Sequence, residues 1–452
     1  MAGTWLSKSG IDPTSSTTTA TWSFWFKTDS HTDGSTEHFL FSTYSDGNSR
    51  MHIKLDANNC VDVNSRMSST VHLSKITNRR LNDPTAWYHL VVTIDTTDAT
   101  ADDRCKIYVN GVRETSFSSS TNPSQNQDIQ SLQGNQTHYV ATYGGNTGNA
   151  SYTFGGCMSC LNFIDGTAYQ ASTFGSTDSS TGEWKINVTP TVTYGNNGWF
   201  ILKNGSGITN LAGNSAGNFT LGGGTLTTTV DNPSNNFCSL NPRGYAANSF
   251  TLIELNNYSG GADNNWRSIF GTLGAKAGKY YYEMKCIGTS GNERFGACTV
   301  DQANKCTGST GRYDDSASGS EGYGYASDGQ KTNNGGAASY GNTWTTNDIL
   351  SCAIDLDNNK IYFGKNGTWQ DSGDPTSGST GTGAAYTIAS DKFYIPAFAS
   401  YGAAANLAFN FGNGLFRTTA ISSEGTNASG VGKFEYDVPT GYTAWSTKGL
   451  NK

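Results

Sequence analysis

The sequence predicts an all-β protein built from two consecutive antiparallel β-sandwich domains and a short C-terminal segment. Charged residues make up only 14% of the chain, whereas Gly alone contributes 55 residues, which is typical of short strands joined by tight turns. Aromatic residues reach 12%, and such large rings need a pleated surface to cover them. No stretch has a sustained apolar period of 3.6 residues, so we expect little helix beyond single turns near Pro242 and Ile269.

The length of the chain sets the expected number of domains. A single hydrophobic core rarely organises as many as 452 residues, so two domains are expected. Residues 221–242 are dominated by Gly, Thr, Asn and Pro without a sustained period, and we place the linker there. The first domain then covers residues 1–220, the second covers 243–417, and a closing segment covers 418–452.

Strand patterns recur through the first domain. The side chains of Trp22, Phe24 and Phe26 share one face, because strand side chains alternate, and that face is expected in the core. Asn110 and Gly111 stand where a tight hairpin turn needs positive φ. The clearest strands are expected at residues 21–27, 87–95, 106–113, 156–166 and 198–202. The first core is expected to contain Phe24, Trp87, Tyr108 and Phe163.

The second domain shows the same alternation of strands and turns. The triplets at 357–359 and 365–367 carry residues that tolerate positive φ, so they are expected to be turns. Strands are expected at residues 278–284, 349–356, 360–363 and 404–411. The second core is expected to contain Tyr281 or its alternating neighbours, Ile354, Tyr362, Phe398 and Phe411.

Charge and hydropathy exclude several classes of partner. A formal net charge of -7 and a sequence pI near 5.4 disfavour binding to nucleic acid, whose phosphates repel an acidic protein. No run of about eighteen apolar residues occurs, and residues 1–13 lack the pattern of a secretion signal, so we expect no membrane insertion. Nine cysteines, an odd number spread over the chain, indicate free buried thiols in a reducing cytoplasm.

The carboxylates do not form a recognisable catalytic pattern. Hydrolysis of glycans needs two carboxyl groups about 5 to 10 Å apart. The sequence has no Glu-x-Asp-x-x-Glu run, which would place such a pair on one strand face, and Glu183, Glu254 and Glu283 are isolated from other carboxylates. We therefore expect no catalytic residues.

The candidate metal ligands are equally sparse. Cys157 and Cys160 form one C-x-x-C pair, but a zinc site needs two further ligands at suitable spacing. All six histidines lie before residue 139, so no histidine can act as a base in the second domain. The sequence therefore predicts no metal site and no cofactor.

Four segments of the first domain follow one another in a specific order: residues 23–26 (SFWF), 83–92 (DPTAWYHLVV), 106–111 (KIYVNG) and 163–166 (FIDG). This order resembles the concanavalin A-like, laminin-G-type jelly rolls of phage virion proteins. Sandwiches of this type sometimes hold calcium at a loop rim with carboxylates and carbonyl oxygens. Calcium therefore stays an alternative at the acidic loops, beside the reading of these loops as solvated turns: residues 29–33, Asp46, Asp102 and Asp103.

Five segments of the second domain also occur in a specific order: residues 278–283 (GKYYYE), 322–325 (GYGY), the hairpin 355–367, 394–398 (YIPAF) and 410–412 (NFG). In this order they resemble a SPRY domain. SPRY domains usually meet ligands at the loops of one end of the sandwich. Carrying that over by region gives five candidate ligand-binding residues: Arg312, Tyr313, Asp328, Lys331 and Trp344. Trp344 has an alternative reading as a plug of its own sandwich.

The closing segment completes the resemblance. Residues 436–447 (YDVPTGYTAWST) are similar to the end of phage proteins that join these two domains. The pairing implies a structural protein of a tailed phage, which acts at the virion surface as a tail fibre, spike or head decoration and is made in the host cytoplasm. Its implied partners are other virion proteins, copies of itself and host-surface glycan.

Two other functions stay open at this point. One is a phage depolymerase that cleaves host polysaccharide, which new reducing ends in a glycan incubation would reveal. The other is an intracellular peptide-binding adaptor, because SPRY domains can bind peptides. No signalling or ubiquitin-transfer module accompanies the domain, which disfavours the adaptor.

Overall fold

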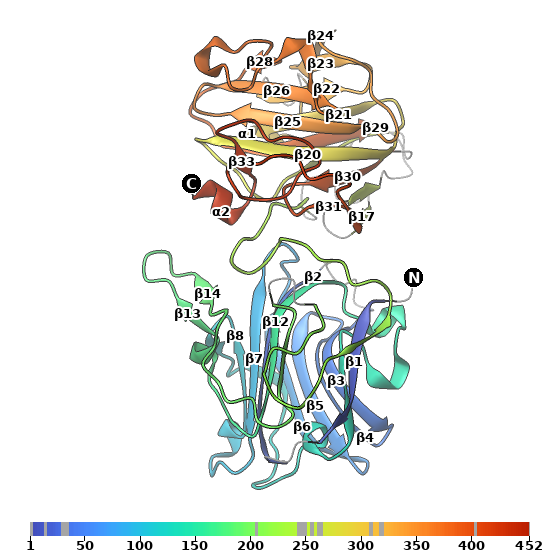
Figure 1. The fold of residues 1–452 in the computed structure, drawn as a ribbon, viewed down its shortest axis with the longest axis vertical. Helices are drawn as coiled ribbons and strands as arrows, with labels where there is room; N and C mark the ends of the chain where they lie inside the picture. The colour runs from blue at the N-terminus through green and yellow to red at the C-terminus, as the bar shows by residue number, and fades with distance from the viewer. Residues whose placement is uncertain are drawn as a thin grey trace. The chain divides into compact units, whose positions relative to one another are not determined.

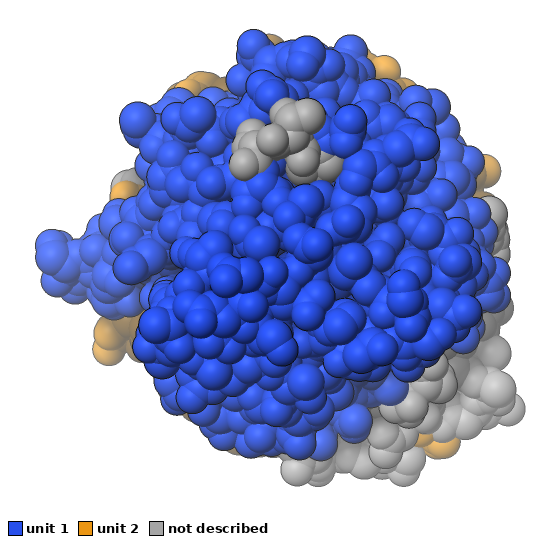
Figure 2. Space-filling model, turned by 90° about the horizontal axis from the view of Figure 1, so that it is seen from below, with its two compact units in different colours: residues 1–228 blue, residues 229–452 orange. Residues whose placement is uncertain are grey.

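The chain folds into two compact units, residues 1–228 and residues 229–452 (Figure 2). Two short helices occur among the described residues, α1 (Val300–Ala303) and α2 (Thr447–Leu450), and neither is long and apolar enough to cross a membrane. The remaining regular structure consists of strands and single 3-10 turns (Figure 1). The computed structural model describes residues 3–12, 16–28, 36–203, 207–241, 251–253, 257–259, 265–306, 311–315, 321–401 and 405–451.

Unit 1 is a sandwich of two antiparallel sheets. The larger sheet has the order β10 (Phe117–Thr121), β6 (Thr70–Arg80), β5 (Cys60–Met67), β4 (Ser49–Leu55), β3 (His38–Asp46), β11 (Gln136–Val140), β1 (Trp5–Ile11), β16 (Thr220–Gly223). The smaller sheet has the order β15 (Trp199–Ile201), β12 (Gly156–Asp165), β2 (Thr19–Thr28), β7 (Tyr88–Asp95), β8 (Cys105–Val109), β9 (Val112–Arg113). A separate hairpin joins β13 (Gly175–Thr177) and β14 (Trp184–Ile186). The 3-10 turns are η1 (Ala101–Asp103), η2 (Gln130–Leu132), η3 (Gly144–Asn146), η4 (Ala150–Tyr152) and η5 (Ala171–Thr173).

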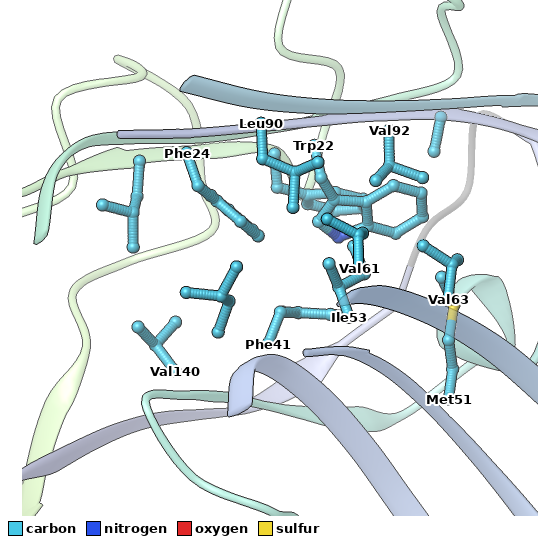
Figure 3. Close-up of a cluster of buried hydrophobic side chains, with 14 of the residues drawn as sticks. Trp22, Phe24, Phe41, Met51, Ile53, Val61, Val63, Leu90, Val92 and Val140 are labelled. Carbon is cyan, nitrogen blue, oxygen red and sulfur yellow. The ribbon is translucent and has the colours of Figure 1, made fainter. Parts of the chain in front are cut away.

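The core of unit 1 lies between its two sheets. Trp22, Phe24 and Phe26 of β2 are fully buried there, which confirms the face predicted from strand alternation. Figure 3 shows Trp22 and Phe24 pointing toward side chains of the opposite sheet, among them Phe41 and Ile53. The predicted core residue Phe163 also belongs to this cluster.

Two residues predicted for this core lie on the other side of the smaller sheet. Tyr108 stands between Ile107 and Val109, whose side chains take the inward positions of β8, so alternation turns Tyr108 outward. It packs instead in a small cluster with Phe174 and other residues, and Trp87 packs in another with Trp25. The prediction was wrong about the core but right about burial, because residues 169–200 cover this outer side.

Unit 2 has the same two-sheet plan. The larger sheet has the order β17 (Thr251–Ile253), β18 (Asn257–Ser259), β30 (Asn406–Asn410), β20 (Lys279–Gly288), β25 (Ile349–Asp355), β26 (Lys360–Lys365), β27 (Thr368–Trp369), with β28 (Tyr386–Thr387) beside β26 and β33 (Thr443–Ala444) beside β20. The smaller sheet has the order β19 (Trp266–Phe270), β29 (Tyr394–Tyr401), β21 (Glu293–Thr299), β22 (Gly322–Ala326), β23 (Gln330–Asn333), β24 (Gly336–Ser339). A hairpin joins β31 (Leu415–Phe416) and β32 (Thr419–Ala420), and η6 (Gln370–Ser372) and η7 (Gly378–Thr380) are 3-10 turns.

The core of unit 2 contains most of the residues predicted for it. Ile354, Phe398 and Phe411 pack there together with Tyr280 and Tyr282, the neighbours of Tyr281. Tyr362 was predicted in this core, but it packs with Tyr281 on the outer side of the larger sheet. Ile269 lies in strand β19 rather than in a helical turn, and the turn expected near Pro242 falls outside the described residues.

The C-terminal segment covers that outer side of unit 2. We call the outer side of β20, β25 and β26 the covered face, because Tyr281, Ala353 and Tyr362 pack there against later residues. Those later residues are Val431, Phe434, Val438, Tyr442 and Ala444. The ring of Phe434 meets the ring of Tyr281 edge-on at 4.9 Å between centroids.

The carboxylate of Glu283 fixes this segment to the sheet. It accepts hydrogen bonds from the backbone N–H groups of Glu435 and Tyr436, both at 2.9 Å, from the hydroxyl of Tyr281 at 3.0 Å and from the amide of Asn410 at 3.2 Å. Burial raises the pKa of Glu283 to about 7, and these four donors oppose the rise. The residue is thus a polar anchor inside an apolar interface.

The expected linker is packed at both of its ends. Leu221 of β16 pairs with Leu6 of β1 in unit 1. Phe237 and Leu240 are buried in unit 2. None of the nine cysteines, all of which lie in the described part of the chain, is in a disulfide, as predicted, and all of them except Cys157 are buried.

Candidate functional site

The five ligand-binding candidates in unit 2 differ in their exposure. Tyr313 is fully buried and Trp344 is 3% exposed within the unit 2 core, which matches the reading of Trp344 as a plug. Tyr313 can lie flat on the smaller sheet because Gly296 and Gly324 leave room there. A Cβ atom at Gly324 would come within 2.9 Å of the Tyr313 hydroxyl. The side chains of Tyr313 and Trp344 therefore do not offer a surface to a ligand.

The other three candidates have partners within unit 2. The guanidinium of Arg312 lies 4.9 Å from the ring of Trp266, and its Nε lies 2.8 Å from Oδ1 of buried Asp314. Lys331 lies over the rings of Tyr340 and Tyr386. Asp328 is exposed and accepts a hydrogen bond from the backbone of Gln330, which forms the turn into β23. Two of the five side chains, those of Tyr313 and Trp344, are therefore buried, and the other three contact neighbouring groups of unit 2.

A more polar arrangement occurs on unit 1, on the outer side of the larger sheet. Residues that pair across antiparallel strands point to the same side, so the register arranges these side chains in rows. The rows are Tyr44–Arg50–Arg66, then Tyr139–Ser42–His52–Asn64, then Phe39–Lys54–Asp62. The alternate residues of β4 and β5, such as Met51, Ile53 and Val63, fill the core. We call this outer side of β3, β4 and β5 the polar face.

A loop brings further rings to the polar face. Tyr143 lies 5.6 Å from Tyr44 and 5.1 Å from Phe39 between ring centroids, and 6.0 Å from Tyr152. The hydroxyl of Ser42 fixes the loop, because it donates to the carbonyl of Thr142 at 2.8 Å and accepts from the N–H of Gly144 at 2.9 Å.

Charges are balanced at one end of the polar face. Lys54 forms ion pairs with Glu37 and, at 3.5 Å, with Asp62. The imidazole of His52 lies 3.3 Å from the same Asp62 carboxylate. Burial alone would raise the pKa of Asp62. The hydrogen bonds and charges of His52 and Lys54 lower it by more than burial raises it, so the pKa lies below its ordinary value.

Asp62 is unsuited to act as the general acid of glycan hydrolysis. Glu37 and Asp62 share Lys54 and are therefore close to each other. A general acid must keep its proton near neutral pH, which requires a raised pKa. The lowered pKa of Asp62 instead keeps this residue ionised.

Two buried histidines resemble parts of catalytic groups but have structural partners. Nε2 of His89 lies 2.9 Å from the hydroxyl of Ser23, which is the spacing of a nucleophile and its base. Nδ1, however, accepts a hydrogen bond from the indole of Trp184 at 2.9 Å, so the Nε2–H donates to Ser23. His138 accepts from Trp199 in the same way at 3.1 Å. Burial lowers the pKa of both histidines to about 3, so both are neutral.

The acidic loops considered for calcium have other partners where the structure describes them. Asp46 accepts from the backbone N–H of Asn48. Asp103 forms an ion pair with Arg113 at 2.7 Å, and Asp102 accepts from Asn122. Residues 29–33 lie outside the described residues, and in the described part no group of three His, Cys, Asp or Glu side chains is placed to hold a metal ion.

The comparisons assign a domain type to each unit. Residues 7–167 match the concanavalin A-like lectin/glucanases superfamily, and residues 279–414 match the SPRY domain. A concanavalin A-like domain and a SPRY domain are therefore both present, and the predicted all-β sandwich class is confirmed.

Individual relatives match only parts of the chain. The ATP-dependent RNA helicase DDX1 of Xenopus laevis is 31% identical over 102 residues, which is 23% of this chain and 12% of the helicase. The solved SPRY domain of human HERC1 is 14% identical, covers 38% of this chain and 93% of its own, and has a TM-score of 0.28. A heptameric SAP-like pentraxin from Limulus polyphemus is 12% identical, covers 37% of this chain and 71% of its own, with a TM-score of 0.27.

The sequence-based predictions did not include the polar face, although the sequence contains a pattern that indicates it. In residues 49–55 the polar side chains Arg50, His52 and Lys54 alternate with apolar ones. Such alternation marks a strand with one side in the core and one side open. The register that aligns these side chains with Tyr44 and Asn64 depends on strand pairing, which the sequence does not reveal.

Proposed function

We propose that this chain is a non-enzymatic attachment protein and that the polar face of unit 1 binds host-surface glycan. The composition of that face carries the proposal: partly exposed tyrosine rings lie beside guanidinium, imidazole and amide groups. Aromatic rings stack on sugar rings, and the polar groups can hydrogen-bond sugar hydroxyls. A concanavalin A-like domain beside a SPRY domain supports a binding role.

The proposal that the protein is not an enzyme rests on the chemistry of the groups that come closest to a catalytic site. Glu37 and Asp62 are bridged by Lys54, and the pKa of Asp62 is lowered. In a catalytic triad, the Nδ1–H group of the histidine donates a hydrogen bond to a carboxylate. Nδ1 of His89 instead accepts a hydrogen bond from Trp184, so it has no proton to donate. Asp62 is therefore not prepared to act as a general acid, and His89 is not prepared to act as a general base toward Ser23.

The place of action belongs to the same proposal. We assign the chain to the surface of a tailed-phage particle, as a tail fibre, spike or head decoration, made in the host cytoplasm. The resemblance of both sandwiches and of residues 436–447 to phage proteins supports this, and free cysteines fit synthesis in a reducing compartment. Display in many copies could raise a weak affinity by roughly 10² to 10⁴.

Contacts with other virion proteins, or between copies of this chain, need an apolar surface. Phe393 is 57% exposed and Val300 is 39% exposed, and a backbone hydrogen bond of 3.0 Å joins the two residues. This pair on unit 2 is a candidate contact. Loss of self-association in Phe393→Ser, measured by light scattering, would support it, whereas unchanged association would exclude it.

A binding experiment tests the glycan proposal. Wild-type protein, Asn64→Ala and His52→Ala are compared on immobilised envelope and capsular glycans, with Glu424→Ala, an exposed position of unit 2, as the control. We expect the two unit 1 variants to lose binding and the control to keep it. Release of new reducing ends during incubation would replace the proposal with a depolymerase, and equal binding by all variants would move the site elsewhere.

A second experiment tests the location. Antibody labelling of intact particles from cells that produce this chain, together with its copy number by mass spectrometry, is expected to place it on the virion exterior. Its absence from purified particles would contradict the virion assignment and leave the glycan experiment unaffected.

A further inference from the structure

Two arginines of the polar face stand opposite each other without a carboxylate. Arg50 of β4 pairs directly with Arg66 of β5, and like charges in directly opposed positions destabilise a sheet. Among the described residues, no carboxylate oxygen lies within 4.0 Å of either guanidinium group, although both residues are half-buried. Arg50 donates a hydrogen bond to the carbonyl oxygen of Gly47, but no carboxylate of the described residues neutralises either positive charge.

Among the described residues of the polar face, only this row of cations lacks a carboxylate partner. Lys54, two residues further along β4, is neutralised by Glu37 and Asp62. Arg79 of β6 pairs with Glu114 at 3.0 Å. The positive charge of the polar face therefore remains only at the Arg50 and Arg66 end.

Arg66 also keeps an unused hydrogen-bond donor. Its Nε is buried and has no acceptor among the described residues, while the residue as a whole is partly exposed. An unsatisfied buried N–H is unfavourable, and the penalty is larger when the group is charged. A ligand oxygen that accepts from this edge of the guanidinium would remove that cost.

Tyrosines flank the two guanidinium groups. Tyr44 pairs across the strands with Arg50, and the ring of Tyr143 lies 5.6 Å from that of Tyr44. Burial raises the pKa of Tyr143, and the nearby charges of Arg50 and Arg66 oppose the rise, so both cations act at its hydroxyl.

The loop that carries Tyr143 is held close to these rings. A Cβ atom at Gly145 would come within 2.6 Å of the Tyr44 ring, and one at Gly144 within 2.7 Å of the Tyr139 ring. Only bare backbone fits at this distance. The flanking ring is therefore positioned before a ligand arrives, which reduces the entropy lost on binding.

We infer that Arg50 and Arg66 together bind the anionic group of an acidic sugar, its carboxylate or sulfate, while the adjoining tyrosine rings contact the sugar ring. A guanidinium fork matches the two oxygens of such a group and forms charge-assisted hydrogen bonds. The net charge of -7 repels polyanions from the molecule as a whole. Binding of an acidic glycan must therefore occur at a local cationic site. This inference rests on the proposed glycan-binding role of the polar face.

The test uses the full chain and three probes of equal length: an oligogalacturonate, the same oligomer with its carboxylates reduced to alcohols, and a sulfated neutral oligomer. Affinities are measured by calorimetry at low and high salt. We expect Arg66→Gln and Arg50→Gln each to weaken binding of the acidic probes about 10- to 100-fold. Arg66→Lys keeps the charge but loses the fork, so an intermediate loss is expected. The matched control, Arg79→Gln, removes an arginine that is already paired and should bind as wild type does.

The outcomes separate the inference from the function on which it rests. Preference for the galacturonate alone, or for both acidic probes, supports an anion site and identifies its source. Tight binding of the reduced oligomer that His52→Ala abolishes and the arginine variants do not would overturn the inference and leave the glycan role intact. No binding of any probe or glycan by wild-type protein would overturn both. Thermal unfolding of each variant, expected within about 2 °C of wild type, excludes misfolding as the cause of a loss.

Discussion

The outer sides of the larger sheets in the two units differ in their exposure to solvent. The polar face of unit 1 carries Tyr44, Arg50 and Asn64 and stays partly exposed. The covered face of unit 2 carries Tyr281 and Tyr362, which the C-terminal segment buries. Both sheets belong to antiparallel sandwiches, so the fold does not determine which side can bind. The decisive difference is whether the chain returns over the sheet after its last core strand.

Removing the cover of unit 2 should have the largest effect. Phe434→Ala deletes a fully buried ring that contacts Tyr281. We expect unit 2 to lose about 3 to 5 kcal/mol of its free energy of unfolding. Denaturant unfolding measures this, with Phe393→Ala as the control, because Phe393 is 57% exposed and should change stability by less than about 0.5 kcal/mol. Equal effects of both substitutions would mean that the segment does not cover the sheet in solution.

The pH dependence of stability should separate the two units. His89 and His138 have pKa values of about 3 in the folded protein, against 6.5 as the ordinary value. Their contribution is present above pH 6.5 and is lost as the pH falls toward 3, because the unfolded chain takes up protons first. At pH 5 the two histidines together should lower the free energy of unfolding of unit 1 by about 4 kcal/mol relative to its value above pH 6.5.

Glu283 should act on unit 2 in the opposite direction. Its folded pKa of about 7 exceeds the ordinary value of 4.5, so its contribution is full below pH 4.5 and declines as the pH rises through 7. Hydrogen exchange followed separately for peptides of each unit measures both trends. Parallel changes in the two units between pH 5 and 7 would contradict them.

A smaller effect is expected when the anchor itself is changed. Glu283→Gln keeps the shape of the side chain but turns its NH₂ group toward a backbone N–H group of the C-terminal segment. The free energy of unfolding of unit 2 should therefore fall by about 2 kcal/mol at pH 5. The substitution should also remove the decline between pH 4.5 and 7. Glu424→Gln is the matched control, since its pair with Lys433 is exposed and should contribute less than about 1 kcal/mol.

The smallest effect on stability is expected at the polar face. Arg50→Gln and Arg66→Gln remove one of two opposed positive charges, so unit 1 should stay within about 0.5 kcal/mol of wild type or become slightly more stable. Thermal unfolding measures this. A loss above about 2 kcal/mol would show that the arginines serve the fold rather than a ligand.

The comparison also explains what the sequence could and could not predict. Alternation identified Trp22, Phe24 and Phe26 as core, because a strand with one buried side has a period of two. It misplaced Tyr108 and Tyr362, because both sides of their sheets are buried and alternation then no longer separates core from surface. The candidate residues Tyr313 and Trp344 were chosen by region, and burial depends on packing that a region does not specify.

The polar face depends on long-range pairing for the same reason. Tyr143, which contacts the ring of Tyr44, lies about one hundred residues later in the chain. Ser42 holds the loop that carries Tyr143 by a hydrogen bond to Gly144. Local patterns contain no information about such a contact. The covered face likewise depends on Glu283, which the sequence shows as an isolated carboxylate and the structure shows as the acceptor for the closing segment.

The late strands of both units have a consequence for synthesis on the ribosome. β1 remains an open edge until residues 220–223 of β16 have been made, and β20 does not receive β33 until residues 443–444 are made. Unpaired edges and uncovered apolar faces invite pairing with other chains. Nascent chains interrupted before these points would expose these edges and faces, so incomplete copies should aggregate more readily than the complete chain.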